Sequence, residues 1–243
     1  MTADEIAAAS ERLAEADAQD ICAWALETFG EQAAFAFSGA EDVVVIDLLA
    51  RTGLPFSVFT LETHRLHDET YDLLRRVEDN YDLQIELVRP RAQEVDALVA
   101  RGGYDGMFGS IEARKDCCRV RKVEPLRRRL ASGDAWLTGL RRDQAVTRAA
   151  LAVVEWDTDS GGLVKVNPLA AWSHEHVWTW IHEHDVPHNR LHDAGYASIG
   201  CVPCTRPISP GDDVRAGRWW WEDPGSRECG LHMDPSGRLV RKR

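Results

Sequence analysis

The sequence lacks three features that would assign it to a broad class of protein at once. No apolar run approaches the about 20 residues that a membrane-spanning helix needs. Positive charge is in deficit, because 29 lysines and arginines stand against 40 aspartates and glutamates, which gives a net charge of −11. The first residues, Met1 to Glu5, are acidic where a secretory leader is basic. We therefore expect a cytoplasmic protein with no membrane partner and no nucleic-acid partner.

Six cysteines are present, and four of them form two pairs. In a reducing compartment, cysteines bind metals or react more often than they form structural disulfides. Cys117 and Cys118 are adjacent, whereas Cys201 and Cys204 are separated by two residues. Side chains of adjacent residues diverge and fit awkwardly around one tetrahedral ion, while a cubane cluster offers several irons. An iron–sulfur cluster is the favoured interpretation, and a zinc site or disulfides stay open as alternatives.

Short apolar runs alternate with helix-length segments along most of the chain. The strand-like runs cover residues 33–37, 56–61, 83–88, 135–139, 152–156 and 163–166, the last two joined by a turn at 160–162. The helix-like segments cover residues 3–28, 43–49, 68–81, 110–130 and 173–184. This alternation predicts an α/β fold with a doubly wound, mostly parallel sheet. We expect a nucleotide-binding domain over residues 1–195, and an irregular C-terminal segment of the same domain over residues 196–243.

The predicted helix over residues 110–130 carries the first cysteine pair, with Ser110 as its expected N-cap. Lys122 follows Cys118 by four residues, so the two share a face of this helix. Lys122 is therefore placed to contact both a metal site and a bound anion. A solvated surface lysine is the alternative.

The turn after the first predicted strand has the form of an anion-binding loop. Ser38 and Gly39 end the strand, and a helix follows Asp42. Backbone N–H groups in such a strand–turn–helix unit point at a bound phosphate. The loop lacks the Lys-Ser/Thr ending of the common P-loop, so a turn that serves tight packing alone is the alternative. Ligands of a parallel sheet bind where its strands end, which is where Ser38 and Leu61 are expected.

Arginines follow the fourth predicted strand. Gly139 ends that strand, and Arg141, Arg142 and Arg148 come next. A guanidinium fork matches the face of a sulfate or phosphate, which favours anion contacts here. Structural ion pairs are the alternative for Arg141 and Arg142.

The C-terminal segment contains the remaining candidate residues. Three consecutive tryptophans at 219–221 cannot all face one way, so some of them should pack this segment onto the protein. Arg215 and Arg218 lie three residues apart beside these tryptophans and are placed to bind one doubly charged anion together. Cys229 is followed by glycine in an irregular stretch, where a thiolate would be accessible.

Taken in order, these motifs resemble those of the assimilatory adenylyl-sulfate (APS) reductases, the iron–sulfur type of the phosphoadenylyl-sulfate (PAPS) reductase and PP-loop superfamily. The similar segments run from about residue 34 to residue 233 and are Ser-Gly-x-x-Asp, Cys-Cys-x-x-Arg-Lys, Thr-Gly-x-Arg-Arg-Asp-Gln, Cys-x-x-Cys-Thr-Arg-Pro, Arg-x-x-Arg-Trp-Trp-Trp and Glu-Cys-Gly-Leu-His. One motif departs from the pattern, because Glu62-Thr63-His64 stands where the family usually has Asp-Thr-Gly. The resemblance implies a PP-loop architecture, like that of the adenine nucleotide alpha hydrolases.

The resemblance also implies a role for each matching residue. The ligands of a [4Fe–4S] cluster would be Cys117, Cys118, Cys201 and Cys204. The catalytic residues would be Cys229, as the nucleophile, and Lys122. The residues around the substrate would be Ser38, Gly39, Asp42, Leu61, Gly139, Arg148, Arg215 and Arg218.

The expected reaction is the reduction of APS to sulfite and AMP. The Cys229 thiolate would attack the sulfur and release AMP, and thioredoxin or a similar dithiol protein would then free sulfite from the S-sulfocysteine. The nearest alternative is a PAPS reductase, which by resemblance lacks the two cysteine pairs. A PP-loop tRNA-thiolating enzyme and a zinc-stabilised nucleotide-binding module without enzymatic activity are the others. A homo-oligomeric assembly stays open.

Overall fold

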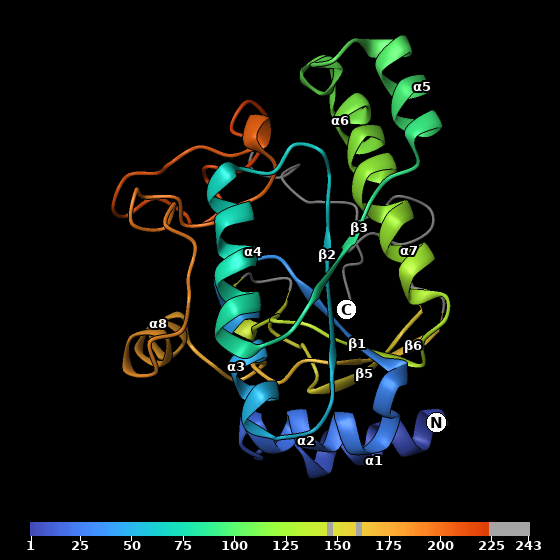
Figure 1. Ribbon diagram of the computed structural model, residues 1–243, viewed down its shortest axis with the longest axis vertical. Coiled ribbons are helices and arrows are strands. Elements are labelled where there is room, and N and C mark those ends of the chain that lie inside the picture. The colour runs from blue at the N-terminus through green and yellow to red at the C-terminus, as the bar shows by residue number, and fades with distance from the viewer. Residues whose placement is uncertain (145–147, 159–161, 224–243) are drawn as a thin grey trace. The chain divides into compact units, whose positions relative to one another are not determined.

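The computed structural model describes residues 1–144, 148–158 and 162–223 (Figure 1). Its α-helices are α1 Ala3–Arg12, α2 Ala18–Phe29, α3 Ala40–Arg51, α4 Asp68–Tyr81, α5 Ala92–Gly102, α6 Ile111–Cys118, α7 Glu124–Leu130 and α8 His174–Glu183. Its strands are β1 Ala33–Phe37, β2 Ser57–Leu61, β3 Ile85–Val88, β4 Ala135–Leu137, β5 Val154–Asp157 and β6 Leu163–Val166. Its shorter turns of helix are η1 Gly30–Gln32, η2 Gly106–Phe108, η3 Arg119–Val123, η4 Arg142–Gln144 and η6 Val202–Cys204.

In the described chain, six strands form one sheet in the order β3-β2-β1-β4-β6-β5. β1 pairs in parallel with β2 and with β4, β4 pairs in parallel with β6, and β5 runs antiparallel to β6. The predicted α/β fold with a mostly parallel sheet is therefore confirmed. β2 and β4 flank β1 on opposite sides, so the strand order reverses at β1. In the register of β1 and β4, Phe35 lies opposite Leu137. Open α/β sheets bind ligands at such a switch point, beyond the carboxyl ends of the strands.

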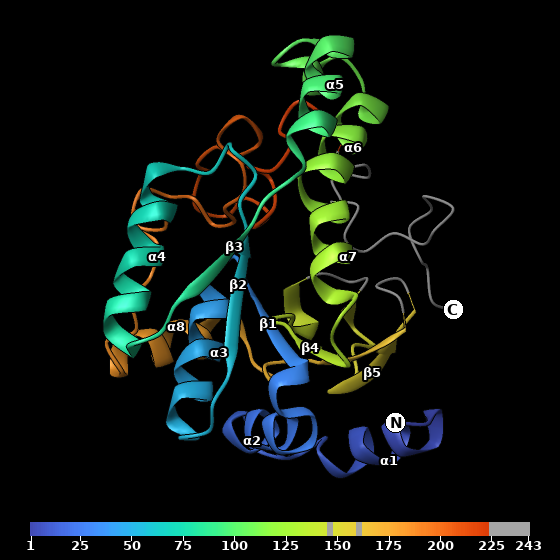
Figure 2. The same cartoon turned by 45° about the vertical axis from the view of Figure 1, so that its right-hand side comes forward.

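The contacts within the chain group its residues into two units. The first unit consists of Met1–Thr60, Leu73–Glu86 and Leu130–His188. The second consists of Leu61–Asp72, Leu87–Arg129 and the chain from Asn189 onward. In the first unit, α3 contacts both α2 and α8, and α1 contacts β5 (Figure 1). In the second unit, α5 and α6 lie side by side, as both views show (Figures 1 and 2).

The centre of the first unit is built from apolar segments. β1 has the sequence Ala-Ala-Phe-Ala-Phe and is buried along almost its whole length, as expected of a central parallel strand. α3 buries every residue from Val43 to Leu49. This burial anchors the carboxyl end of β1 and the first turn of α3, which together form the candidate anion site.

The predicted helix over residues 3–28 is wrong in one respect, because the chain forms two helices there. α1 ends at Arg12, and α2 begins after Asp17, which has extended backbone angles (φ −63°, ψ 146°) as its N-cap. Leu13, between them, is buried. Both helices bury an apolar face, so the apolar periodicity continues across the break and does not reveal it.

Two predicted helix starts are confirmed by their caps. The Oγ of Ser110 accepts a hydrogen bond from the N–H of Ala113 at 3.1 Å, and the Oγ of Ser173 accepts one from the N–H of His176 at 3.0 Å. A serine at this position satisfies an N–H group that the helix leaves without an acceptor. The turn predicted at residues 160–162 lies mostly outside the described residues. Within the described part of the chain, no helix has the length and apolar character required to cross a membrane.

Candidate functional site

The predicted anion-binding loop lies in the first unit, at the carboxyl end of β1. Gly39 is the N-cap of α3 and has an extended backbone (φ −142°, ψ −175°). The first N–H groups of a helix have no acceptor within the helix and lie at the positive end of its dipole. This end of α3 is therefore suited to an anion such as a phosphate.

Asp42 holds the loop in this shape. Its Oδ2 accepts hydrogen bonds from the N–H of Ser38 at 2.7 Å, the Oγ of Ser38 at 2.8 Å and the N–H of Gly39 at 2.7 Å. Its Oδ1 accepts one from the N–H of Gly139 at 3.1 Å. Burial raises the pKa of Asp42 to about 6, although the donors of Ser38 and Gly39 oppose the shift. The structure thus joins four of the predicted substrate-binding residues in one network, in which Asp42 orders the backbone.

Gly139 is required by the close approach of two chain segments. A Cβ atom at this position would lie 2.3 Å from Oδ1 of Asp42 and 3.1 Å from its backbone nitrogen. β4 runs beside β1, so the chain that leaves β4 passes directly against the first turn of α3. A residue without a side chain is needed at this contact.

Glu41 binds two residues of the segment that follows β4, at the same end of α3. Its Oε1 accepts hydrogen bonds from Nη2 of Arg141 at 3.0 Å and from Nε2 of Gln144 at 3.1 Å. Arg148 in turn donates to Gln144. Arg141 is therefore an ion-pair partner, one of the two roles that its sequence context allows. Arg148 belongs to the hydrogen-bond network around the predicted anion site.

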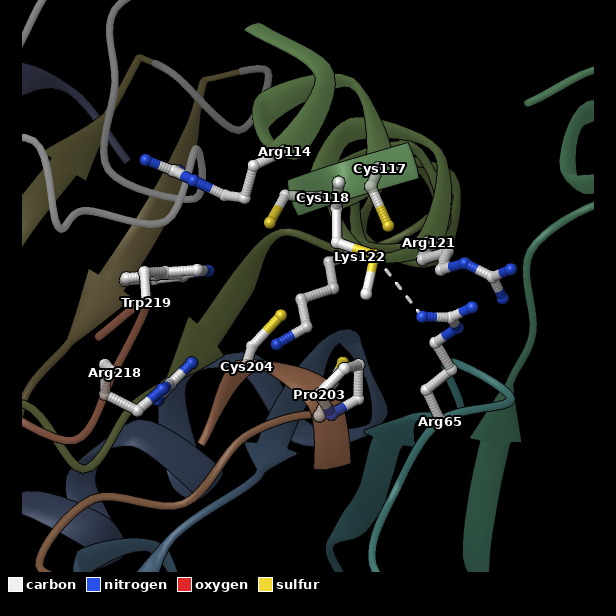
Figure 3. Close-up of a pocket in the computed structure, with 12 residues that line it drawn as sticks. Arg65, Arg114, Cys117, Cys118, Arg121, Lys122, Pro203, Cys204, Arg218 and Trp219 are labelled. Carbon is white, nitrogen blue, oxygen red and sulfur yellow. Dashed lines mark hydrogen bonds between the residues drawn. The ribbon is translucent and has the colours of Figure 1, made fainter. Parts of the chain in front are cut away.

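The second unit holds the other predicted site, a cavity that all four paired cysteines line (Figure 3). Cys117 and Cys118 come from the end of α6, and Cys201 and Cys204 come from the chain at η6. Cys118, Cys201 and Cys204 are buried and form one packed cluster with Trp219, whereas Cys117 is partly exposed. All four are free thiols.

A π-helical turn brings basic residues to the same cavity. α6 ends at Cys118 and continues as the π-turn η3, with α7 following. Arg121 and Lys122 each follow one of the cysteines by four residues, and both line the cavity. In Figure 3, Lys122 extends from the helix towards Cys204. Lys122 and Cys118 thus lie at one cavity, as their helical spacing predicts, and π-turns are frequent at functional sites.

Cations outnumber anions around the cysteine cavity. Its basic lining residues are Arg65, Arg114, Arg121, Lys122 and Arg218, and no carboxylate is among the described residues that line it. Burial, followed by repulsion from Cys201, raises the pKa of Cys204 to about 11. Burial also raises the pKa of Cys117, although Arg121 opposes it. Burial therefore favours the neutral thiols, whereas the surrounding cations favour the ionised form in which cysteine binds a metal.

Three buried N–H donors on residues lining this cavity have no acceptor in the described chain, namely Nε of Arg65, Nε of Arg121 and Nε1 of Trp219. Buried donors are almost always satisfied in proteins, and the sulfur atoms of a cluster would be suitable acceptors. The described residues contain no group of three His, Cys, Asp or Glu side chains arranged around a single metal ion. The four thiols and these three donors are the groups that would hold and surround a metal cluster at this cavity.

The tryptophans differ in burial as predicted, because Trp219 is 1% exposed whereas Trp220 is 41% exposed. The ring centroid of Trp219 lies 4.7 Å from the guanidinium carbon of Arg218 and 5.8 Å from that of Arg215. Two of the three predicted substrate-binding arginines, Arg215 and Arg218, therefore lie beside one buried ring, which is itself at the cysteine cavity. Such stacking orients a guanidinium while it keeps its charge.

Leu61 and Cys229 were also predicted as site residues. Leu61 is the last residue of β2 and is partly buried. Cys229, the predicted nucleophile, lies outside the described residues, as do its neighbours in the Glu-Cys-Gly-Leu-His motif.

The sequence did not predict three further residues, of which two line the cysteine cavity and one contacts a cysteine. Arg114 lies four residues before Cys118, a helical spacing that could have identified it. Arg65 is buried and contacts Sδ of Met107 at 3.4 Å, and Oγ1 of Thr63 lies 3.3 Å from Sγ of Cys201. Arg65 and Thr63 are distant from the cysteines in the sequence, so no local spacing could have identified them.

A mostly parallel α/β sheet with a candidate anion-binding loop at its switch point is typical of nucleotide-binding proteins of the PP-loop class, and this chain also contains a centre of four thiols. The chain belongs to the phosphoadenosine phosphosulfate reductase domain family, whose model matches residues 32–207.

Similar relatives and a solved structure agree with this family. The chain is 54% identical over 194 residues to a protein of Allochromatium vinosum named adenosine 5'-phosphosulfate reductase, which covers 80% of this chain and 75% of the relative. It is 42% identical over 243 residues to a protein of the same name from Pseudomonas aeruginosa, covering 98% and 89% of the two chains. The solved phosphoadenylyl-sulfate (PAPS) reductase of Candida auris, a phosphate complex, aligns with a TM-score of 0.72 and 29% identity over 85% of this chain and 98% of that one.

Proposed function

We propose that this protein reduces APS to sulfite and AMP in assimilatory sulfate reduction. The observation that carries this proposal is the buried, cationic cavity lined by both cysteine pairs, in a chain of the PAPS reductase family. Relatives of 54% and 49% identity are named adenosine 5'-phosphosulfate reductase. The N-terminus of α3, which follows the loop at Ser38 and Gly39, suits the phosphate of an adenylate. We assign the reaction to the cytoplasm, where reduced thiols and dithiol proteins are supplied.

We further propose that Cys117, Cys118, Cys201 and Cys204 hold a [4Fe–4S] cluster. The cationic lining and the buried donors of Arg65, Arg121 and Trp219 support this assignment. When bound, the cluster would cross-link α6 to the chain at η6 and would provide a fixed charge centre at the cavity that Lys122 lines. The role proposed for Lys122 is to hold its cation beside these thiolates and to neutralise charge on the substrate.

Cys229 is the proposed nucleophile, on the strength of the family motif around it. Its thiolate attacks the sulfur of APS, a sulfur–sulfur bond forms, and the bond to the bridging oxygen breaks, so AMP leaves with the electron pair. Arg148, Arg215 and Arg218 are the proposed contacts of the sulfate and phosphate oxygens. In this step the Cys229 sulfur is oxidised to the disulfide level while the sulfur of APS is reduced, which leaves an S-sulfocysteine on Cys229.

A dithiol protein such as thioredoxin is the proposed reductant. One of its thiolates attacks Sγ of Cys229, and sulfite leaves with the electron pair. The second thiol then resolves the mixed disulfide and restores the Cys229 thiol. The two electrons come from the dithiol, which ends as a disulfide, so the cycle balances without a further oxidant or reductant.

Substrate choice separates the proposal from its nearest alternative, because the solved relative at 29% identity is a PAPS reductase. We expect kcat/KM with thioredoxin to be at least about a hundredfold higher for APS than for PAPS, a difference of about 2.7 kcal/mol. Equal or reversed values would reassign the protein to PAPS reduction.

The covalent step has its own test. Without a dithiol, wild-type protein mixed with APS should stop after one turnover, and mass spectrometry should locate one added sulfonate on the peptide that contains Cys229. Cys229→Ser should bind APS and form no adduct, because serine is a poor nucleophile at neutral pH. Cys22→Ser is the matched control, since Cys22 is buried in α2, and it should react like the wild type. An adduct on Cys22, or turnover by Cys229→Ser, would exclude the mechanism.

A further inference from the structure

A buried ion pair joins the cysteine-bearing helix to the start of the C-terminal segment. Nε and Nη2 of Arg114 donate to the two carboxylate oxygens of Glu222 at 2.8 Å and 2.7 Å. The two side chains are 0% and 3% exposed. Burial disfavours the guanidinium cation, but interactions with Glu222 and with Cys118 outweigh it and raise the pKa of Arg114. A bidentate pair of this kind determines an orientation as well as a distance.

The chain that carries Glu222 is shaped to return to α6. Residues 204–206 run antiparallel to residues 217–219, with the N–H of Trp219 donating to the carbonyl of Cys204 at 3.1 Å. Trp219 has a left-handed backbone conformation (φ 42°), and the N–H of Glu222 donates to its carbonyl at 2.8 Å. Such a conformation is uncommon outside glycine and persists where the surrounding structure imposes it. It turns the chain so that Glu222 meets Arg114 beside the ring of Trp219.

Stability alone is a weak explanation for this pair. Two charges lose their hydration when they are buried, and their attraction compensates for this loss only partly, even with good geometry. The contact is also specific in its location, because Arg114 and Cys118 lie four residues apart on α6 and both line the cysteine cavity. The pair with Glu222 therefore connects the lining of this cavity to the last described turn of the chain. Figure 3 shows Arg114 on the side of the cavity where Cys118 and Trp219 lie.

We propose that Arg114 and Glu222 are positioning residues for Cys229, because their pair anchors the chain that leads to it against the cysteine centre. Glu222 precedes Cys229 by seven residues in the sequence. The inference rests on the proposed function, since it takes Cys229 as the nucleophile. A nucleophile must meet the sulfur of APS in line with the leaving oxygen, and a small misplacement of reacting atoms lowers the rate steeply.

The test compares two carboxylate-to-amide variants that make the same charge change. Glu222→Gln removes the charge of the buried pair and keeps the shape of the side chain. Glu124→Gln is the control, since Glu124 pairs with Arg119 at 3.8 Å and its side chain is 37% exposed. The readouts are the first-order rate of adduct formation on Cys229 at saturating APS, the affinity for AMP, and the iron content per chain. Hydrogen exchange in the peptide over residues 217–223 adds a readout that needs no turnover.

We expect Glu222→Gln to lower the rate of adduct formation by about tenfold to a hundredfold, with AMP affinity and iron content close to those of wild type. Exchange over residues 217–223 should rise, and Glu124→Gln should change none of these quantities. Glu222→Asp keeps the charge and should restore part of the lost rate. Equal rates in Glu222→Gln and Glu124→Gln would overturn the inference.

Two other outcomes are also decisive. Loss of iron from Glu222→Gln, with an unchanged rate per iron-loaded chain, would overturn the inference and make the pair a support of the cysteine centre. If wild-type protein forms no adduct on Cys229, the proposed function fails instead. Faster exchange in Glu222→Gln would then still show that the pair holds this part of the chain, whereas unchanged exchange would reject the anchor as well.

Discussion

Replacing Gly139 by alanine tests how the anion-binding loop is built. The added Cβ would lie 2.3 Å from Oδ1 of Asp42 and 3.1 Å from its backbone nitrogen, so the β4 end or the first turn of α3 must move. Moving either lengthens the 3.1 Å hydrogen bond from the N–H of Gly139 to Asp42. Overpacking costs about 1–3 kcal/mol, and loss of a hydrogen bond to a charged group costs about 1.5–3 kcal/mol. Because partial movement relieves some of both, we expect Gly139→Ala to lower the free energy of unfolding by about 3 kcal/mol.

The same movement should weaken nucleotide binding, because Asp42 also holds the N–H groups of Ser38 and Gly39. We expect AMP affinity to fall at least about tenfold, which corresponds to about 1.4 kcal/mol. Urea unfolding measures the first effect, and calorimetric titration with AMP measures the second.

Gly102→Ala is the matched control for this prediction. Gly102 ends α5, and a Cβ there would meet no atom within 4 Å. The substitution should leave AMP affinity unchanged and raise the free energy of unfolding by up to about 1 kcal/mol, because alanine loses less backbone entropy in a helix. If Gly139→Ala unfolds and binds AMP like the wild type, the close approach of Gly139 to Asp42 does not order this loop.

Three further predictions concern single residues. His64 has a left-handed backbone (φ 59°), so His64→Gly should raise the free energy of unfolding in urea by up to about 1 kcal/mol, and a decrease would refute a strained turn. The raised pKa of Asp42 means that the folded state binds its proton more tightly than the unfolded state does. The contribution of this carboxyl to the free energy of unfolding therefore falls as the pH rises. The unfolding free energy of wild type minus that of Asp42→Asn should therefore fall between pH 3.8 and about pH 6, and a flat difference would contradict the assignment. Cys201→Ser should remove iron and visible absorbance from anaerobically purified protein, whereas stoichiometric zinc without iron in the wild type would reject the cluster.

Local sequence patterns determined most of the secondary structure. α4 has the predicted bounds, Asp68–Tyr81, because its apolar positions recur at helical spacing. Ser110 and Ser173 begin helices because a serine hydroxyl satisfies an N–H group three residues further on. The break between α1 and α2 escaped prediction, since the apolar period continues through it.

The motifs also predicted which residues gather at each site. Ser38, Gly39, Asp42 and Gly139 do form one network, and the paired cysteines do line one cavity with Lys122. The helical spacing of Cys118 and Lys122 was sufficient to predict that these two residues lie at one cavity, because residues four apart share a face of a helix.

Only the tertiary structure showed what these residues contact. Gly139 and Asp42 are 97 positions apart, and they meet because β4 pairs in parallel with β1. Arg114 and Glu222 are 108 positions apart, and they meet because the chain turns back at Trp219 in a backbone conformation that its residue type does not favour. Helix periods and caps depend on interactions within a few residues, so the sequence displays them directly. Contacts between distant segments depend on strand order, burial and imposed turns, which no local pattern encodes.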